Sequence, residues 1–107
     1  MKQDTLIQIF YYDDSTGQLD DNGVYIQNEV LLTTSTALIL PYSRKLAIDK
    51  YGIDVDVNKL IIIDHEISNI NIGMLIKDNK GNQYEIKDIP WDLRRLEILA
   101  HTKVSVS

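Results

Sequence analysis

Three adjacent residues carry the side chains best suited to chemistry. Asp64, His65 and Glu66 place an imidazole between two carboxylates, a combination that can bind a metal ion or transfer a proton. Adjacent residues of an extended segment point to opposite faces, however, and the only other histidine is His101. We therefore expect a polar loop after a buried strand. A hydrolase or metal enzyme built on this triple stays open as an alternative.

An acidic loop is the second candidate site. Residues 13–23 read DDSTGQLDDNG and contain four Asp, two Gly and no basic residue. The aspartates form two adjacent pairs, which do not match the alternating ligands and distal Glu of an EF-hand calcium loop. Asn22-Gly23 is a strong turn dipeptide. We expect a solvated loop that orders on contact with a partner.

The remaining motifs predict no catalytic or cofactor site. The glycines match neither G-x-G-x-x-G nor the P-loop pattern. Ser43 has no neighbouring base in the sequence, and a helix-capping role explains it. The chain has no cysteine, which excludes disulfides, zinc–thiolate sites and cysteine nucleophiles. We therefore expect a protein that is not an enzyme, with no metal and no cofactor.

Two features near the C-terminal strand are candidates for contacts. Trp91 follows Pro90 between two strands, and we interpret it as a core residue that plugs a barrel end. An interface anchor is the alternative, because Trp is enriched at binding hot spots. Arg94-Arg95 is too small a basic spot for nucleic-acid recognition. We expect it to pair with acidic groups on a neighbouring surface.

Extended segments separated by turns must position these residues. Strand-like residue patterns cover residues 5–12, 24–32, 33–42, 59–64, 74–77, 83–89 and 96–106. An irregularity is expected near Asn28, and a hairpin turn over Asp78 to Asn82. Apolar residues recur with period two from Leu96 to Val106, which predicts one buried and one wet face. Leu99 is the apolar exception on the outer side and therefore a candidate contact.

One helix is expected over residues 43–52. Ser43 can cap its N-terminus, Ala47 and Tyr51 share a face, and Gly52 suits a left-handed C′ position. Six or seven short strands, one short helix and long loops predict a mainly β protein, a small antiparallel β-barrel. The length of 107 residues predicts a single domain over residues 1–107.

The charge of the chain restricts its partners. Sixteen acidic against 11 basic residues give a net charge of −5, which argues against binding nucleic acid by phosphate neutralisation. An acidic surface repels phosphate, so DNA could still move past it without being bound. The longest apolar run, Thr36 to Pro41, is too short to span a bilayer, and residues 1–10 lack the apolar core of a secretory signal.

Three stretches together resemble a known family. They combine a strand ending in Pro, a Ser-Arg helix ending in Tyr-Gly-Ile, and an apolar hairpin ending in Ile-Pro-Trp. The stretches are ALILPYSRKLAIDKYGI (37–53), KLIIID (59–64) and NIGMLIKDNKGNQYEIKDIPWDL (71–93). About two thirds of the chain thus resembles the minor capsid proteins of tailed phages and prophages of Gram-positive bacteria. Those proteins are similar to the head-closure, or stopper, proteins of the head–tail connector.

The resemblance implies a small β-barrel that assembles as a homo-oligomeric ring in the virion, after synthesis in the host cytoplasm. The ring would close the portal channel after DNA packaging and provide the docking face for the tail, without catalysis. The implied partners are further copies of the chain, the portal-adaptor protein on one side and a tail-terminator or tail-completion protein on the other. DNA would pass or be blocked without sequence-specific binding, and no membrane partner is implied.

In that family a long loop reaches toward the channel, and the matching candidates here are residues 13–23 and 28–35. The candidate channel or interface residues are Asp13, Asp14, Asp20, Asp21, Asn28 and Glu29. The candidate subunit or partner contacts are Trp91, Arg94, Arg95 and Leu99. Two alternatives stay open: a tail-completion or joining protein of the same connector, and a generic β-barrel module that binds a protein or a small ligand.

Overall fold

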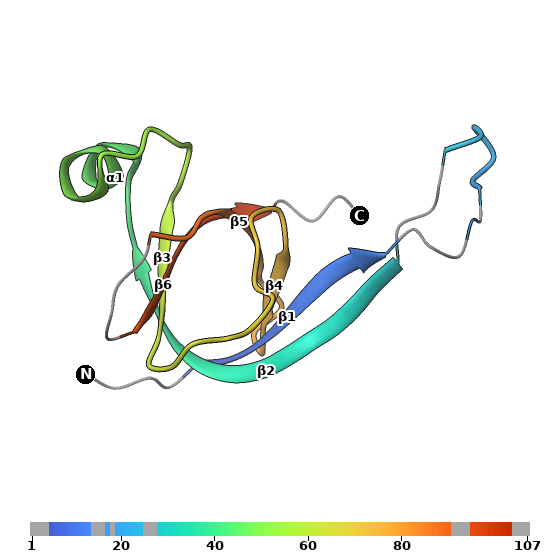
Figure 1. The fold of residues 1–107 in the computed structure, drawn as a ribbon, viewed down its shortest axis with the longest axis horizontal. Coiled ribbons are helices and arrows are strands. Elements are labelled where there is room, and N and C mark those ends of the chain that lie inside the picture. The colour runs from blue at the N-terminus through green and yellow to red at the C-terminus, as the bar shows by residue number, and fades with distance from the viewer. Residues whose placement is uncertain (1–4, 14–16, 18, 25–27, 91–94, 104–107) are drawn as a thin grey trace.

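The computed structural model describes residues 5–13, 17, 19–24, 28–90 and 95–103. Its elements are β1 (Thr5–Asp13), β2 (Asn28–Pro41), α1 (Arg44–Tyr51), β3 (Lys59–Ile63), β4 (Leu75–Asp78), β5 (Gln83–Asp88) and β6 (Leu96–Lys103). The strands close into an antiparallel barrel in the order β1-β2-β3-β6-β5-β4 (Figure 1). The predicted class, a mainly β antiparallel barrel with one short helix, is confirmed, with six strands over the described residues. None of the described helices is long and apolar enough to cross a membrane.

The barrel interior is filled by alternate side chains of each strand. In β1, Ile7 and Ile9 are buried, whereas the alternating residues Leu6 and Gln8 are exposed. The buried residues of this interior cluster are Ile7, Ile9, Ala37, Ile61, Ile63, Ile76, Tyr84, Ile86, Leu96, Ile98 and Ala100. β-branched isoleucines dominate, and these side chains pack well on a pleated surface. The core therefore follows directly from the period-two pattern.

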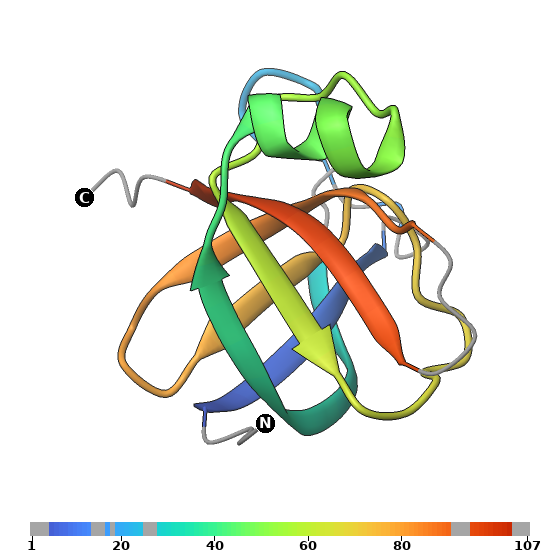
Figure 2. The ribbon, with the colours of Figure 1, turned by 90° about the vertical axis from the view of Figure 1, so that its left-hand side faces the viewer.

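Strand β3 is buried on both of its faces. Ile61 and Ile63 point into the barrel, while Leu60 and Ile62 face outward and are covered by a second cluster beneath α1. Figure 2 shows α1 lying across the end of β2 and the start of β3. The buried residues of this outer cluster are Ala47, Val57, Leu60, Ile62 and Leu99. Burial on both faces explains why β3 is an unbroken apolar run.

The outer face of β6 differs from the prediction. The sequence pattern places Glu97 and Leu99 on a wet face, but Glu97 is 1% exposed and Leu99 is 0% exposed. The reason is α1, which packs over this part of the barrel exterior. The prediction that Leu99 is an outward contact is therefore wrong, because its side chain is already buried within its own chain. Residues 104–106 of the predicted strand lie outside the described residues.

Strand β2 also differs from the prediction. The two predicted segments, 24–32 and 33–42, join over Asn28–Pro41 into one strand of 14 residues. The irregularity expected near Asn28 lies instead at Leu32. Ile9 pairs with Thr33 but Phe10 pairs with Leu31, so that Leu32 is an extra residue on β2. This arrangement is a β-bulge, which bends and twists a ribbon.

The predicted helix ends and hairpin turn are confirmed. The Ser43 hydroxyl accepts a hydrogen bond from the Leu46 amide at 3.2 Å, as an N-cap does. Gly52 has a φ of 70° and donates its amide to the Ile48 carbonyl at 2.9 Å. In the hairpin, the Asp78 amide donates to the Asn82 carbonyl at 3.0 Å.

Candidate functional site

Strands β1 and β2 continue beyond the barrel as a two-stranded ribbon, which we call the arm. It comprises residues 11–13 of β1, residues 28–31 of β2 and the loop between them, of which residues 17 and 19–24 are described. Figure 1 shows the arm projecting on the side away from α1. The molecule therefore measures 45 Å along its long axis, against 27 and 26 Å across.

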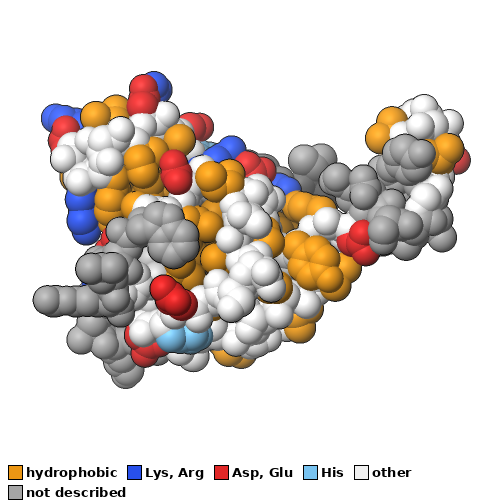
Figure 3. Space-filling view, in the orientation of Figure 1, with side chains coloured by type: hydrophobic (Ala, Val, Ile, Leu, Met, Phe, Trp, Pro, Cys, Tyr) orange, Lys and Arg blue, Asp and Glu red, His pale blue; other side chains and the backbone are white. Residues whose placement is uncertain are grey.

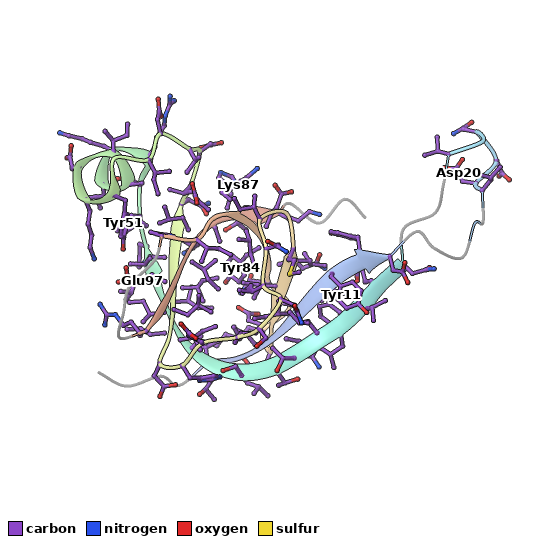
Figure 4. The ribbon with its side chains drawn as sticks, viewed as in Figure 1. Tyr11, Asp20, Tyr51, Tyr84, Lys87 and Glu97 are labelled. Carbon is purple, nitrogen blue, oxygen red and sulfur yellow. The ribbon has the colours of Figure 1, made fainter. Side chains whose placement is uncertain are left out.

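The described part of the arm's loop is a compact turn. One carboxylate oxygen of Asp20 accepts hydrogen bonds from the amides of Asn22 at 2.9 Å and Val24 at 3.0 Å. The Asp20 amide donates to the Val24 carbonyl, and Gly23 has a φ of 78°. The predicted Asn22-Gly23 turn is thus confirmed. Asp21 is exposed beside it, so the turn carries acidic groups far from the barrel (Figure 4).

Two lysines hold the base of the arm against the barrel. Lys77 on β4 forms an ion pair with Glu29 at 2.7 Å, and its ammonium lies 4.8 Å from the centre of the Phe10 ring. Lys103 on β6 donates to the Tyr12 hydroxyl at 3.2 Å. Each such contact contributes roughly 0.5–1 kcal/mol at a partly exposed site. These contacts therefore restrain the arm where it leaves the barrel.

The arm exposes apolar side chains that a lone subunit leaves in water. Leu31 is 48% exposed, and in the loop Leu19 and Val24 are 54% and 60% exposed. Where the arm meets the barrel, a hollow is lined by Tyr11, Leu32, Asn69 and Met74. Figure 3 shows apolar side chains gathered at this junction. Clustered apolar surface of this kind marks a contact site more often than scattered residues do.

Both edges of the arm lack a neighbouring strand among the described residues. Beyond the barrel, β1 has no partner on its outer side, because its pairing with β4 ends at Phe10 opposite Leu75. Strand β2 pairs with β3 only over Leu38–Pro41, so the same edge over residues 28–35 has no strand beside it. Unpaired strand edges are templates for pairing with another chain.

The predicted channel or interface residues lie mostly on the arm. Asp13 and Asn28 pair across its two strands, and Glu29 is the carboxylate bound by Lys77. Asp20 and Asp21 sit in the turn of the loop. Asp14 lies outside the described residues. The sequence predicted a loop that contains most of these residues. It did not indicate that β1 and β2 extend beyond the barrel and place this loop far from it.

The predicted contact residues have a different outcome. Trp91 and Arg94 lie outside the described residues. Arg95 donates to Glu97 of its own chain at 3.2 Å, at the foot of α1. Leu99 is buried in the outer cluster and is not available for a contact with another chain.

The Asp64, His65 and Glu66 triple forms an exposed polar loop after buried β3, as expected. The His65 Nδ1 atom lies 2.9 Å from an Asp64 carboxylate oxygen, and both side chains are more than half exposed. Glu66 lines one shallow hollow with Leu96 and another with His65. Within the described ranges, no three His, Cys, Asp or Glu side chains gather in a way that could hold a metal ion.

A buried carboxylate beneath α1 escaped the sequence analysis. Glu97 accepts a hydrogen bond from the Tyr51 hydroxyl at 2.5 Å, and Arg95 and Lys50 approach it at 3.2 and 3.7 Å (Figure 4). Burial, together with the adjacent Glu97 carboxylate, raises the pKa of Tyr51 above its usual range. A buried carboxylate is tolerated only where donors surround it, as they do here. Because the period-two pattern placed Glu97 in water, the sequence carried no signal for this cluster.

A second polar cluster closes the β4–β5 hairpin. The Asp78 carboxylate accepts hydrogen bonds from the amides of Lys80 and Asn82, and from the Tyr84 hydroxyl at 3.1 Å. Burial and the Asp78 carboxylate raise the pKa of Tyr84 to about 12. Figure 4 shows Tyr84 on the barrel and Lys87 farther along the same strand, where Lys87 pairs with Glu85 at 2.7 Å.

Comparison with known proteins supports the fold. No protein-family model matches the chain, and no curated protein matches it. The solution structure of protein SF1141 from Shigella flexneri 2a is similar, with a TM-score of 0.71 over 97% of this chain and 96% of that chain. The sequences are 22% identical. That similarity shows the fold. It carries no statement about activity.

Proposed function

We propose that this chain is a head-closure subunit of a tailed-phage head–tail connector. In this role it is a structural virion protein that forms a ring, closes the portal channel after DNA packaging and offers a docking face to the tail. The sequence resemblance over residues 37–53, 59–64 and 71–93 supports the proposal. So does a compact barrel with a projecting arm, since a ring needs a body that packs laterally and a segment that reaches a neighbour or the channel.

The arm is the observation that carries the proposal. It leaves Leu19, Val24 and Leu31 in water in the lone subunit and ends in an acidic turn. Apolar surface on a projecting ribbon favours coverage by another protein. Acidic groups near a channel repel phosphates, and this repulsion would keep DNA mobile rather than bound. The same reasoning applies to a tail-completion protein, which differs only in which side of the connector it joins.

A β-barrel binding module is the second candidate function. The hollow lined by Tyr11, Leu32, Asn69 and Met74 favours it, because three apolar side chains and one amide surround the space. Apolar walls with few polar groups are typical of ligand sites. In that case the hollow would be the functional centre, and the acidic turn would be dispensable.

The experiment uses DNA-filled heads from a lysate in which the gene for this chain is deleted. Purified protein added to these heads is expected to protect their DNA from nuclease. A variant in which residues 19–24 are replaced by a Gly-Ser linker should lose most of that protection. Leu46→Ser, which changes an exposed apolar residue of α1 on the side away from the arm, is the matched control and should protect as the wild type does. Heads that stay nuclease-sensitive with wild-type protein would contradict the proposal.

A further inference from the structure

We infer that neighbouring copies join through their arms, the open edge of β2 in one copy pairing with the open edge of β1 in the next. This inference deepens the proposed function and rests on it, because it names the contact that builds the ring. Its starting point is that a single ribbon offers two unlike open edges, one on each strand. An association through unlike edges runs head to tail and closes into a ring when the rotation permits.

The backbone groups at the β2 edge follow from the hydrogen bonds within the barrel. The Tyr42 amide donates to the Asn58 carbonyl. In this part of β2 the backbone amides and carbonyls of even-numbered residues therefore point toward β3, and those of odd-numbered residues point toward β1. The bulge at Leu32 reverses this order. In the arm, the backbone groups of Val30 therefore point toward β1, while those of Leu31 point to the open edge.

The β1 edge follows in the same way. The Ile86 amide donates to the Met74 carbonyl, which directs the backbone groups of Leu75 toward β1. Leu75 pairs with Phe10, so the even-numbered residues of β1 face β4. Because β4 ends at this level, the amide and carbonyl of Tyr12 point beyond it, to the open edge.

Ring symmetry gives these two edges compatible directions. Rotation about a ring axis keeps all arms pointing the same way along that axis. Since β1 and β2 are antiparallel within one arm, β2 of one copy is also antiparallel to β1 of its neighbour. Tyr12 of one copy then pairs with Leu31 or Glu29 of the next, the residues whose backbone groups face outward. Antiparallel pairing of neighbouring ribbons needs no connecting segment.

The side chains and surfaces along both edges fit this contact. Residues 30–35 read VLLTTS, with neither the charge nor the Pro that commonly protects an edge strand. Glu29 is already paired with Lys77 in its own chain. A shallow hollow borders each edge, one lined by residues 71–74 beside Tyr12 and one lined by residues 65–69 beside Thr33. An added strand would cover the half-exposed Leu31.

Single cysteines test the contact directly, because the chain has no cysteine of its own. Tyr12→Cys and Leu31→Cys proteins are mixed and oxidised mildly, so every disulfide must join two chains. We expect their mixed dimer to form at least tenfold faster than a mixed dimer of Leu6→Cys and Leu46→Cys, two sites about as exposed as Leu31 that lie outside the arm. If two Leu31→Cys chains join to each other faster than the mixed pair does, the contact is a two-fold one between like edges, and the inference is overturned.

Proline variants separate this inference from the proposed function. Tyr12→Pro removes an amide that faces outward, whereas Tyr11→Pro removes one that faces β2. Tyr12→Pro is expected to have the same unfolding midpoint as Tyr12→Phe, which loses the same hydrogen bond from Lys103, but to lose binding to the gene-deleted heads. Tyr11→Pro should lower the midpoint further. If Tyr12→Pro protects the heads fully, the arm contact is wrong and the head-closure function stands. If wild-type protein gives no protection and the cysteine variants give no mixed dimers, both fall.

Discussion

At the residue scale, two carboxylates stabilise the fold by accepting hydrogen bonds from donors of the same chain. Glu97 is held by Tyr51, Arg95 and Lys50 beneath α1. Asp78 is held by the hairpin that it begins. These carboxylates fasten a helix and a turn to the barrel, and substituting each one isolates its contribution.

Glu97→Ala should destabilise the fold by about 2–4 kcal/mol, because it leaves three donors without their buried acceptor. Urea unfolding at pH 7 measures the change. Glu85→Ala is the matched control, since Glu85 pairs with Lys87 at a site more than one third exposed. The control should change the free energy of unfolding by less than about 1 kcal/mol. Equal effects of the two substitutions would contradict the structural role of Glu97.

Asp78 predicts a loss of stability in acid. Burial alone would raise the pKa of Asp78, but the hydrogen bonds from Asn82, Lys80 and Tyr84 outweigh it and lower that pKa. The folded state therefore favours the ionised carboxyl. Its stabilisation is present above the unfolded pKa of about 4 and is lost as pH falls through the lower folded pKa. Urea unfolding from pH 7 to pH 2 should show a shallower acid dependence for Asp78→Asn than for the wild type.

His65→Ala should leave the protein unchanged, because the histidine is exposed and its ring nitrogen meets the neighbouring Asp64 at the surface. We expect the free energy of unfolding to shift by less than about 0.5 kcal/mol, and the protection of DNA-filled heads to be retained. A loss of protection with unchanged folding would instead favour chemistry at this loop.

At the element scale, the sequence predicted where the strands and the helix lie better than it predicted what packs against them. Period-two alternation marks a strand, and Ser43 and Gly52 mark the two ends of α1. Alternation does not tell whether the outer face of a strand meets water or a helix, so Glu97 and Leu99 were misplaced. Nor does it reveal a bulge. Thr33 and Thr34 therefore looked like a boundary between two strands, whereas β2 runs through them without a break.

The candidate site was predictable in composition but not in shape. The acidic residues and the Asn22-Gly23 turn predicted an exposed loop, which the structure confirms. The arm itself depends on the relative lengths of strands that pair far apart in the sequence. Strand β4 begins at Leu75, opposite Phe10, and only this pairing shows where β1 leaves the barrel.

The base of the arm gives a prediction for this element. Lys77→Ala removes both the ion pair with Glu29 and the contact with the Phe10 ring. Amide hydrogen exchange at residues 28–31 should accelerate several-fold, while global stability falls by about 1 kcal/mol or less. Lys87→Ala, which breaks an ion pair away from the arm, should leave exchange in the arm unchanged. Unchanged exchange in Lys77→Ala would mean that the lysine does not restrain the arm.

At the scale of the whole molecule, the barrel contains the apolar core and the arm presents exposed apolar surface. The barrel buries two apolar clusters, and its six strands close on one another without a strand from another chain. The arm adds length, open edges and exposed apolar side chains that contribute little to that core. Assembly would therefore pair the open strand edges and cover the apolar side chains that the arm exposes in the lone subunit.

The number of copies bound to each head tests this account most directly. Gene-deleted, DNA-filled heads are saturated with the purified chain, washed, and analysed by quantitative mass spectrometry against the portal subunit. The head-closure proposal predicts several copies per head, in a fixed ratio to the portal ring, and a ring of density beneath the portal in electron micrographs. A single copy, a variable number or no bound chain would contradict it.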